Sequence, residues 1–213
     1  MIRQIPFFGG EYYHIYNRGT NKMRIFNSPT DYNRFTKLLY LANSQETIQY
    51  SDTNENGIWK IKRGEPLVEI GAYVLMPNHF HLLIKVKDEK STSLFIQRLL
   101  ISHSKYFNKK YERKGSLFQG KSRSVHIDND RYLKYLFAYI HLNPVKIIDP
   151  EWKESGIRNL DKTIDFLNNY KYSSYHDYKG DERVEGKILQ KEVFPKYFKN
   201  PQEHIDELIE WLS

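Results

Sequence analysis

The chain has 213 residues, of which 39% are apolar and 28% charged, a balance typical of a globular protein rather than a disordered one. Its formal charge is +7, and it has no cysteine, which excludes disulfides, zinc–thiolate sites and cysteine nucleophiles. No apolar run approaches the roughly 18 residues that a membrane span needs, and the apolar patch at 5–8 is too short for a signal peptide. We therefore expect a cytoplasmic protein without membrane contact.

In the first half of the chain, apolar periodicity and turn residues predict mainly strands. Ser28-Pro29 is an N-cap followed by proline, the usual start of a helix. Met76-Pro77-Asn78 separates two apolar strands, which we expect to pair as a hairpin. The predicted elements are strands at 11–17, 58–62, 67–75 and 79–87 and a helix at 29–43.

In the second half, helical spacing dominates. We expect helices at 91–114, 129–143, 160–169 and from 201 onward, and an extended segment at 116–127. Without the short segment at 58–62 the order is β-α-β-β-α-β-α, which is the α+β, ferredoxin-like split βαβ plan with an antiparallel sheet and one added helix. We divide the chain into a domain at 1–180 and a C-terminal extension at 181–213, which packs on that domain or on a second copy.

The net charge is concentrated in one segment. Ser91–Val125 contains eight basic residues and one acidic residue, Glu112, so the rest of the chain is balanced. Aromatic residues interleave with the basic ones. Cations pair with phosphates and aromatic rings stack on bases, so this pattern favours contact with single-stranded nucleic acid. An ordinary solvated face remains the alternative.

His79-Phe80-His81 lies on a predicted strand, where alternate side chains share a face. We therefore expect both imidazoles on one side, where they could form a bidentate metal platform, and Phe80 in the core. A tripeptide this short also occurs by chance, so two ordinary histidines remain the alternative.

The helix at 131–143 has an apolar stripe and, on a different face, three tyrosines at helical spacing. Tyr139 and Asn143 are one turn apart, so a phenol and an amide stack on one side of the last turn and could meet a metal held by the histidines. The alternative is an amphipathic helix in a tyrosine-rich protein.

Several segments resemble the HUH single-tyrosine transposases. YVLMPNHFHLLIKV at 73–86 is similar to their metal-binding segment, and YIHLNPVK at 139–146 is similar to the end of their tyrosine helix. Weaker similarity extends to GSLFQGKSRS at 115–124, YHIYNRG at 13–19 and KYSSYHDY at 171–178. The resemblance covers residues 10–178 and is closest to the REP-associated tyrosine transposases.

The resemblance implies a metal-dependent enzyme that nicks and rejoins single-stranded DNA at hairpin-flanked sites through a covalent 5′-phosphotyrosine. It implies that His79 and His81 bind Mg²⁺ or Mn²⁺, that Asn143 is a third ligand and that Tyr139 is the nucleophile. Tyr132 and Tyr135 on the same helix are rival nucleophiles. A homodimer is left open.

The single strand and hairpin would then contact the basic segment and the end of the first strand. The candidates are Asn17, Arg18, Arg98, Lys105, Lys109, Lys110, Lys121 and Arg123, with Phe118 as a stacking face. Two other functions remain open. One is a non-catalytic DNA or RNA hairpin-binding module on the same fold; the other is a metallohydrolase, although Asp88 and Glu89 fall past the end of the histidine strand.

Overall fold

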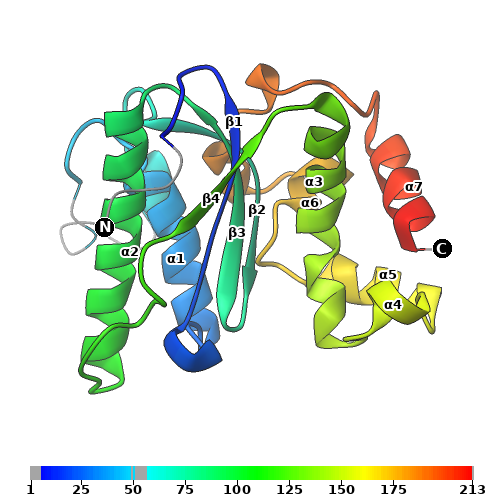
Figure 1. Ribbon diagram of the computed structural model, residues 1–213, viewed down its shortest axis with the longest axis horizontal. Coiled ribbons are helices and arrows are strands. Elements are labelled where there is room, and N and C mark those ends of the chain that lie inside the picture. The colour runs from blue at the N-terminus through cyan, green and yellow to red at the C-terminus, as the bar shows by residue number, and fades with distance from the viewer. Residues whose placement is uncertain (1–5, 49, 51–56, 213) are drawn as a thin grey trace.

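A computed structural model describes residues 6–48, 50 and 57–212 (Figure 1). Its first part has the order β-α-β-β-α-β-α and ends in a helix that packs on the sheet. The elements are β1 (Tyr12–Arg18), α1 (Pro29–Leu41), β2 (Val68–Met76), β3 (His79–Val86), α2 (Glu89–Lys110), β4 (Arg123–Ile127) and α3 (Asp130–Leu142).

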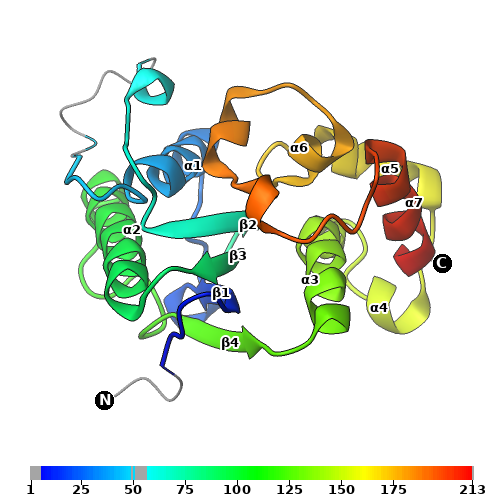
Figure 2. The ribbon, with the colours of Figure 1, turned by 90° about the horizontal axis from the view of Figure 1, so that it is seen from above.

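The four strands form one antiparallel sheet in the order β2-β3-β1-β4. The two halves β1-α1-β2 and β3-α2-β4 thus interleave, which is the ferredoxin-like split βαβ arrangement that the element order predicts. Seen from above, α1 and α2 lie on one side of the sheet and α3 on the other (Figure 2). The predicted fold class is confirmed.

Strand alternation decides which residues meet which helices. In β1, Tyr13 and Ile15 belong to the core under α1 and α2, whereas Tyr12 packs with the core under α3. In β3, Phe80 is in the first core and Leu83 in the second. His79 and His81 therefore lie on the α3 face, opposite Phe80, as the two-residue period predicts.

Side-chain caps explain where the helices begin. Asp31 accepts hydrogen bonds from the backbone N–H of Asn27 and Ser28 in the capping box of α1. Asn129 accepts from Tyr132 N–H at 2.8 Å at the start of α3. The predicted helix at 91–114 ends earlier, at Lys110, because Glu112 has a left-handed backbone with φ of 50°.

Two predicted extended segments are different in the structure. Residues 58–62 form no strand among the described residues; Ile58–Lys60 is a 3₁₀ turn, with Ile58 buried in the core rather than paired to a sheet edge. Of 116–127, only Arg123–Ile127 is a strand. The preceding residues bend around the end of β1, where Gln119 N–H donates to Arg18 O at 2.9 Å. They lie next to the sheet without continuing it.

After α3 the chain forms short helices that pack around α3 and along the β2 edge of the sheet. They are η4 (Asn143–Ile147), α4 (Trp152–Ser155), α5 (Leu160–Asn169), α6 (Tyr175–Lys179), η5 (Val184–Ile188), η6 (Lys191–Val193) and α7 (Pro201–Leu212). The predicted helices at 160–169 and from 201 are confirmed. No described helix has the length and apolar character to cross a membrane.

The C-terminal extension packs on its own chain. Gln190 N–H donates to Ile70 O at 3.0 Å, and the Phe194 ring covers Gly71, where an added Cβ would lie 2.6 Å from the ring. The domain boundary at residue 180 stays a prediction.

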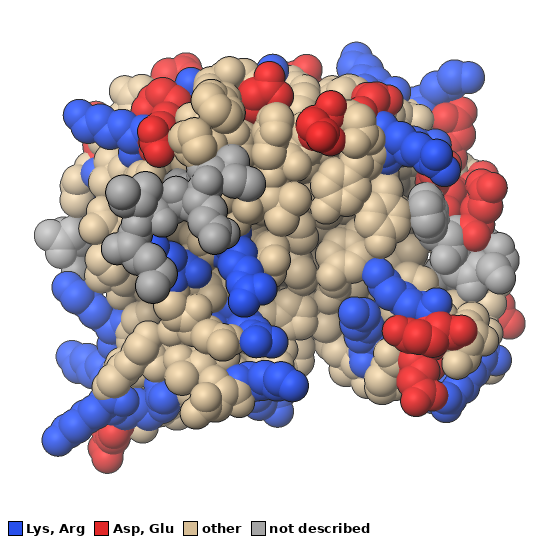
Figure 3. All heavy atoms as spheres, viewed as in Figure 1, with Lys and Arg blue, Asp and Glu red and all other residues tan. Residues whose placement is uncertain are grey.

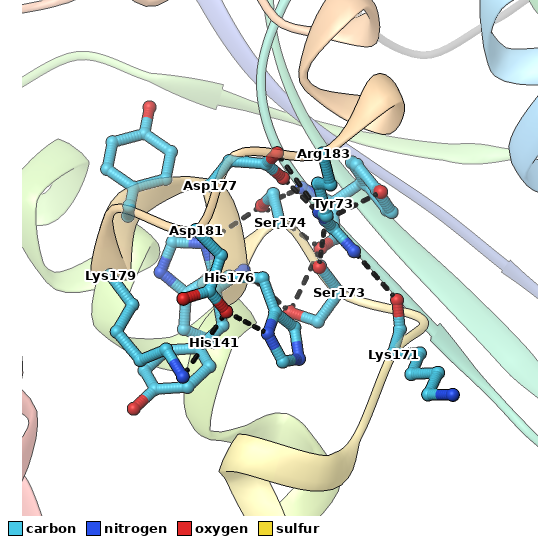
Figure 4. A network of polar contacts seen from close by, with 12 residues as sticks. Tyr73, His141, Lys171, Ser173, Ser174, His176, Asp177, Lys179, Asp181 and Arg183 are labelled. Carbon is cyan, nitrogen blue, oxygen red and sulfur yellow. Dashed lines mark hydrogen bonds and ion pairs between the residues drawn. The ribbon is translucent and has the colours of Figure 1, made fainter.

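A polar network links α3 to β2 and to the segment at 171–183 (Figure 4). His141 on α3 hydrogen-bonds the Ser174 hydroxyl at 2.8 Å, and that hydroxyl also accepts from Tyr73 N–H on β2 at 2.9 Å. Nearby, the Arg183 guanidinium pairs with the Asp177 carboxylate and donates to the Tyr73 hydroxyl at 3.1 Å. Sheet, extension and α3 are thereby held in one position.

Candidate active site

Three imidazoles meet on the α3 face of the sheet. Antiparallel pairing of β1 with β3 places Tyr16 opposite His81, and His14 two residues along on the same face. The His14 Nε2 and His81 Nδ1 atoms are 2.8 Å apart, and the His79 and His81 rings are nearly perpendicular with centroids 5.0 Å apart. Sequence reasoning missed His14, although its alternation with Tyr12 and Tyr16 on one strand face was visible.

The tyrosines of α3 face His14 and His81 across a pocket of about 330 Å³. Tyr139 is nearest, with its ring centroid 5.4 Å from that of His81 and 6.1 Å from that of His14. Tyr132, Tyr135 and Tyr139 form a ladder with successive centroids 6.1 and 6.0 Å apart. The pocket is lined by His14, Tyr16, His81, Val125, Tyr132, Tyr135, Leu136 and Tyr139.

Asn143 lies one turn beyond Tyr139 with 1% of its surface exposed. Neither its amide oxygen nor its nitrogen has a hydrogen bond of normal geometry to any described residue. The amide is still close enough to act on the pKa of both His79 and Tyr139. An unpaired buried amide is costly, and its place beside His79 and Tyr139 fits a group that could bind a cation.

Burial sets the protonation of the site. It lowers the pKa of His14 and of His79 to about 4, and it lowers the pKa of His81 well below the ordinary value. The imidazoles are therefore neutral at pH 7 and keep a lone pair for a cation. Burial also raises the pKa of Tyr139, so its phenol is protonated at that pH.

Hydrogen bonds occupy one ring nitrogen of His79 and one of His81. The Nδ1 atom of His79 lies 2.6 Å from Asn78 Oδ1, to which it donates, and the Nδ1 atom of His81 pairs with His14. Nε2 of each ring is thus the nitrogen left for a ligand. The described residues contain no group of three or more His, Cys, Asp or Glu side chains that could hold a metal, so the donor set here would be two imidazoles and the Asn143 amide.

Four of the predicted DNA contacts are buried or hold other parts of the fold. Phe118 is 4% exposed and packs in the core, so it offers no stacking face, and Asn17 is 4% exposed, with its amide donating to Gly120 O. The Arg98 guanidinium donates to Ser44 O at 2.6 Å and Thr47 Oγ1 at 2.8 Å, which holds the loop after α1. Lys110 pairs with buried Asp31 at 2.6 Å. The sequence shows the charge or ring of these four side chains, but it does not show that they are buried or hydrogen-bonded within the fold.

The other predicted contacts are exposed side chains: Arg18, Lys105, Lys109, Lys121 and Arg123. Of these, Arg18 also donates to the Gln119 side-chain oxygen. On the face drawn in Figure 3, basic side chains gather on both sides of a hollow at the lower edge, while acidic ones lie along the upper edge and on the lobe to the right of the hollow. In the same view, this hollow lies between the strands and the lower end of α3. A polyanion would find cations on both sides of that hollow.

The family of IS200-like transposases has a model that matches residues 11–143, more than half of the chain and every strand of the sheet. The chain belongs to this family. A REP-associated tyrosine transposase bound to a REP hairpin is similar in fold, with a TM-score of 0.50 and 16% identity over 87% of this chain and 89% of that one.

A bacterial tRNA(His) guanylyltransferase-like protein in complex with ATP aligns with a TM-score of 0.38 and 10% identity, over 98% of this chain and 93% of that one. No curated protein that was compared matches the chain.

Proposed function

We propose that this IS200-like transposase nicks and rejoins single-stranded DNA with Tyr139 as its nucleophile and with a divalent cation held by His79, His81 and Asn143. The observation that supports this most is the position of the Tyr139 ring, 5.4 Å from the His81 ring and one turn from an unpaired buried amide. All of these groups come from one chain, so the proposal needs no second copy.

The residues fit Mg²⁺ or Mn²⁺ in chemical type. Neutral imidazoles are good ligands for Mn²⁺, and an amide oxygen suits either ion. When bound there, the cation would withdraw charge from the scissile phosphate as the transition state forms. His14 would orient His81, since a His81 ring that binds through Nε2 donates from Nδ1 to His14.

The proposed reaction exchanges one phosphodiester for another. A bond forms between Tyr139 Oη and phosphorus, and the bond between phosphorus and the 3′ oxygen breaks. The phenol loses its proton to solvent and the departing 3′ oxygen gains one, so the products are a 5′-phosphotyrosine and a free 3′-hydroxyl. Attack by a 3′-hydroxyl on the phosphotyrosine reverses these changes and rejoins DNA without ATP.

A DNA hairpin with a single-stranded flank is the substrate that we propose. The pocket is open and only about 330 Å³, which suits one strand laid across the sheet rather than a duplex. The structurally similar transposase is bound to a REP hairpin, which favours the same class here. Exposed cations, among them Arg18, Lys109 and Arg123, would contact the phosphates.

The test is adduct formation on a denaturing gel. Hairpin oligonucleotides taken from the flanks of the gene are incubated with Mn²⁺ and with wild-type protein, His79→Ala, His81→Ala or the double variant. We expect a covalent protein–DNA band with wild type, none with the variants and hairpin binding within a few-fold of wild type, because phosphate contacts supply most of the affinity. A double variant that cleaves at the wild-type rate would overturn the proposal.

A further inference from the structure

One cation lies directly against the proposed nucleophile. The Nζ atom of Lys153 is 4.2 Å from the centroid of the Tyr139 ring and 3.5 Å from the Tyr135 hydroxyl. Lys153 belongs to α4, beyond residue 143, where the match to the transposase family ends. The family comparison therefore assigns it no role.

The packing of α4 explains why the lysine lies there. Trp152, its neighbour, is 8% exposed and belongs to one apolar cluster with Ala138 and Leu142 of α3. Before α4, the Asp149 carboxylate accepts from Arg158 N–H at 3.2 Å, which closes the loop between α4 and α5. In Figure 1, α4 accordingly lies beside the lower end of α3. The position of the Lys153 stem is thus set by buried contacts rather than by its own charge.

Within the described residues, the Lys153 ammonium forms no ion pair at 4.0 Å or less. Its contacts are the Tyr139 ring, the Tyr135 hydroxyl and, at 5.5 Å, the Trp152 ring. Burial lowers the pKa of Lys153, and the carboxylate of its neighbour Glu154 opposes that shift. An ammonium held against phenols, with no ion-pair partner within 4.0 Å among the described residues, is suited to an incoming anion.

We propose that Lys153 binds a nonbridging oxygen of the scissile phosphate while Tyr139 attacks the phosphorus atom. Lys153 would then be a catalytic residue, and this inference rests on the function proposed above. In-line attack requires phosphorus within about 3–3.5 Å of the Tyr139 oxygen. A phosphate at that place lies within reach of an ammonium on a flexible four-carbon stem that already touches the same ring. A fixed positive charge there stabilises charge that develops on the phosphate in the transition state.

The contact also serves the covalent intermediate. The 5′-phosphotyrosine is a diester on Tyr139 that keeps one negative charge, and this charge stays next to Lys153. The same ammonium therefore faces the phosphate in the forward attack and in rejoining, which a reversible strand transfer requires.

The experiment compares a charged and a neutral scissile phosphate. Single-turnover adduct formation is measured with wild type, Lys153→Met and Lys153→Arg, on a hairpin with the natural phosphodiester and on the two separate methylphosphonate stereoisomers at that position. Lys162→Met, which removes one charge from α5, is the matched control. Thermal unfolding and hairpin binding are measured for every variant.

On the phosphodiester we expect Lys153→Met to slow adduct formation about 100-fold, with Lys153→Arg close to wild type and Lys162→Met unchanged. On at least one methylphosphonate isomer the loss caused by Lys153→Met should shrink to about 3-fold or less, because the oxygen that the ammonium binds is gone. Hairpin affinity and melting temperature should stay near wild type.

A Lys153→Met variant that forms the adduct at the wild-type rate, or that loses the same factor on the diester and on both methylphosphonates, would overturn this role of Lys153 and leave the proposed function intact. The absence of any adduct with wild type and every hairpin substrate would instead contradict the proposed function itself.

Discussion

His14→Phe tests whether His14 orients His81 for the proposed cation. The substitution keeps an aromatic ring in the pocket but removes the nitrogen that lies 2.8 Å from His81 Nδ1. His81 is 5% exposed, so its Nδ1 would lose its partner in a buried place at a cost of about 1–3 kcal/mol. If the intact pair orients His81 for a cation, this cost appears as weaker metal binding, and loss of an orienting partner typically lowers metal affinity about 10–100-fold.

The assay is the rate of adduct formation against Mn²⁺ concentration. For His14→Phe we expect the midpoint to move about 10–100-fold to higher Mn²⁺, while the rate at saturation stays within a few-fold of wild type. The Mn²⁺ midpoint of His14→Gln, whose amide can restore a hydrogen bond, should lie between those of wild type and His14→Phe. An unchanged midpoint would refute the orienting role, and a rate that saturating Mn²⁺ does not restore would show that His14 acts directly in the reaction.

Three further predictions concern stability and DNA binding. Asp31→Ala should lower the free energy of unfolding by about 2–3 kcal/mol in urea, because it removes a buried carboxylate that caps α1 and accepts hydrogen bonds from the Tyr106 and Tyr111 hydroxyls. Burial opposes the ionisation of Asp31, but hydrogen bonds from neighbouring groups outweigh it and hold the pKa of Asp31 below the ordinary value. The ionised carboxylate therefore stabilises the fold above about pH 4, and this stabilisation is lost as the pH falls further. The loss of stability with acid should be smaller in Asp31→Ala than in wild type. Gly71→Ala should destabilise by about 1–3 kcal/mol in thermal unfolding, and Phe194→Ala in the same chain should remove much of that clash, so that additive losses would contradict it. Lys109→Ala should lower the slope of log affinity against log salt by about 0.7 for single-stranded DNA, whereas Arg98→Ala should change stability and leave the slope alone; equal slopes for Lys109→Ala and wild type would contradict a phosphate contact.

The fold was predictable because local signals agreed with one another. Pro29 after Ser28 marks the start of α1, as predicted. Pro144 marks the end of the α-helix, but the chain continues through it as the 3₁₀ helix η4 rather than stopping. The two-residue period of β3 places Phe80 in the core and the histidines on the other face. A β-α-β-β-α-β order has few compact solutions, and the observed sheet is one of them.

The site was only partly predictable, because contacts between distant segments depend on register and burial. Spacing alone brings His79 next to His81 and Tyr139 next to Asn143, but it does not reveal that β1 supplies His14 or that α4 supplies Lys153. In the basic segment, by contrast, the sequence predicted a contact that the structure does not offer. Charge and ring type suggested one DNA-binding run, whereas the turn after α2 buries Phe118 in the core.

The identity of the nucleophile is tested most directly by mapping the covalent adduct. Tyr132, Tyr135 and Tyr139 line the same pocket, but only Tyr139 has ring contacts with His81 and lies one turn from Asn143. After protease digestion of the wild-type adduct, mass spectrometry should find the DNA on the peptide that contains Tyr139. The adduct should be absent from Tyr139→Phe and present in Tyr132→Phe and Tyr135→Phe. An adduct that persists in Tyr139→Phe, or one that maps to Tyr132 or Tyr135, would contradict the account.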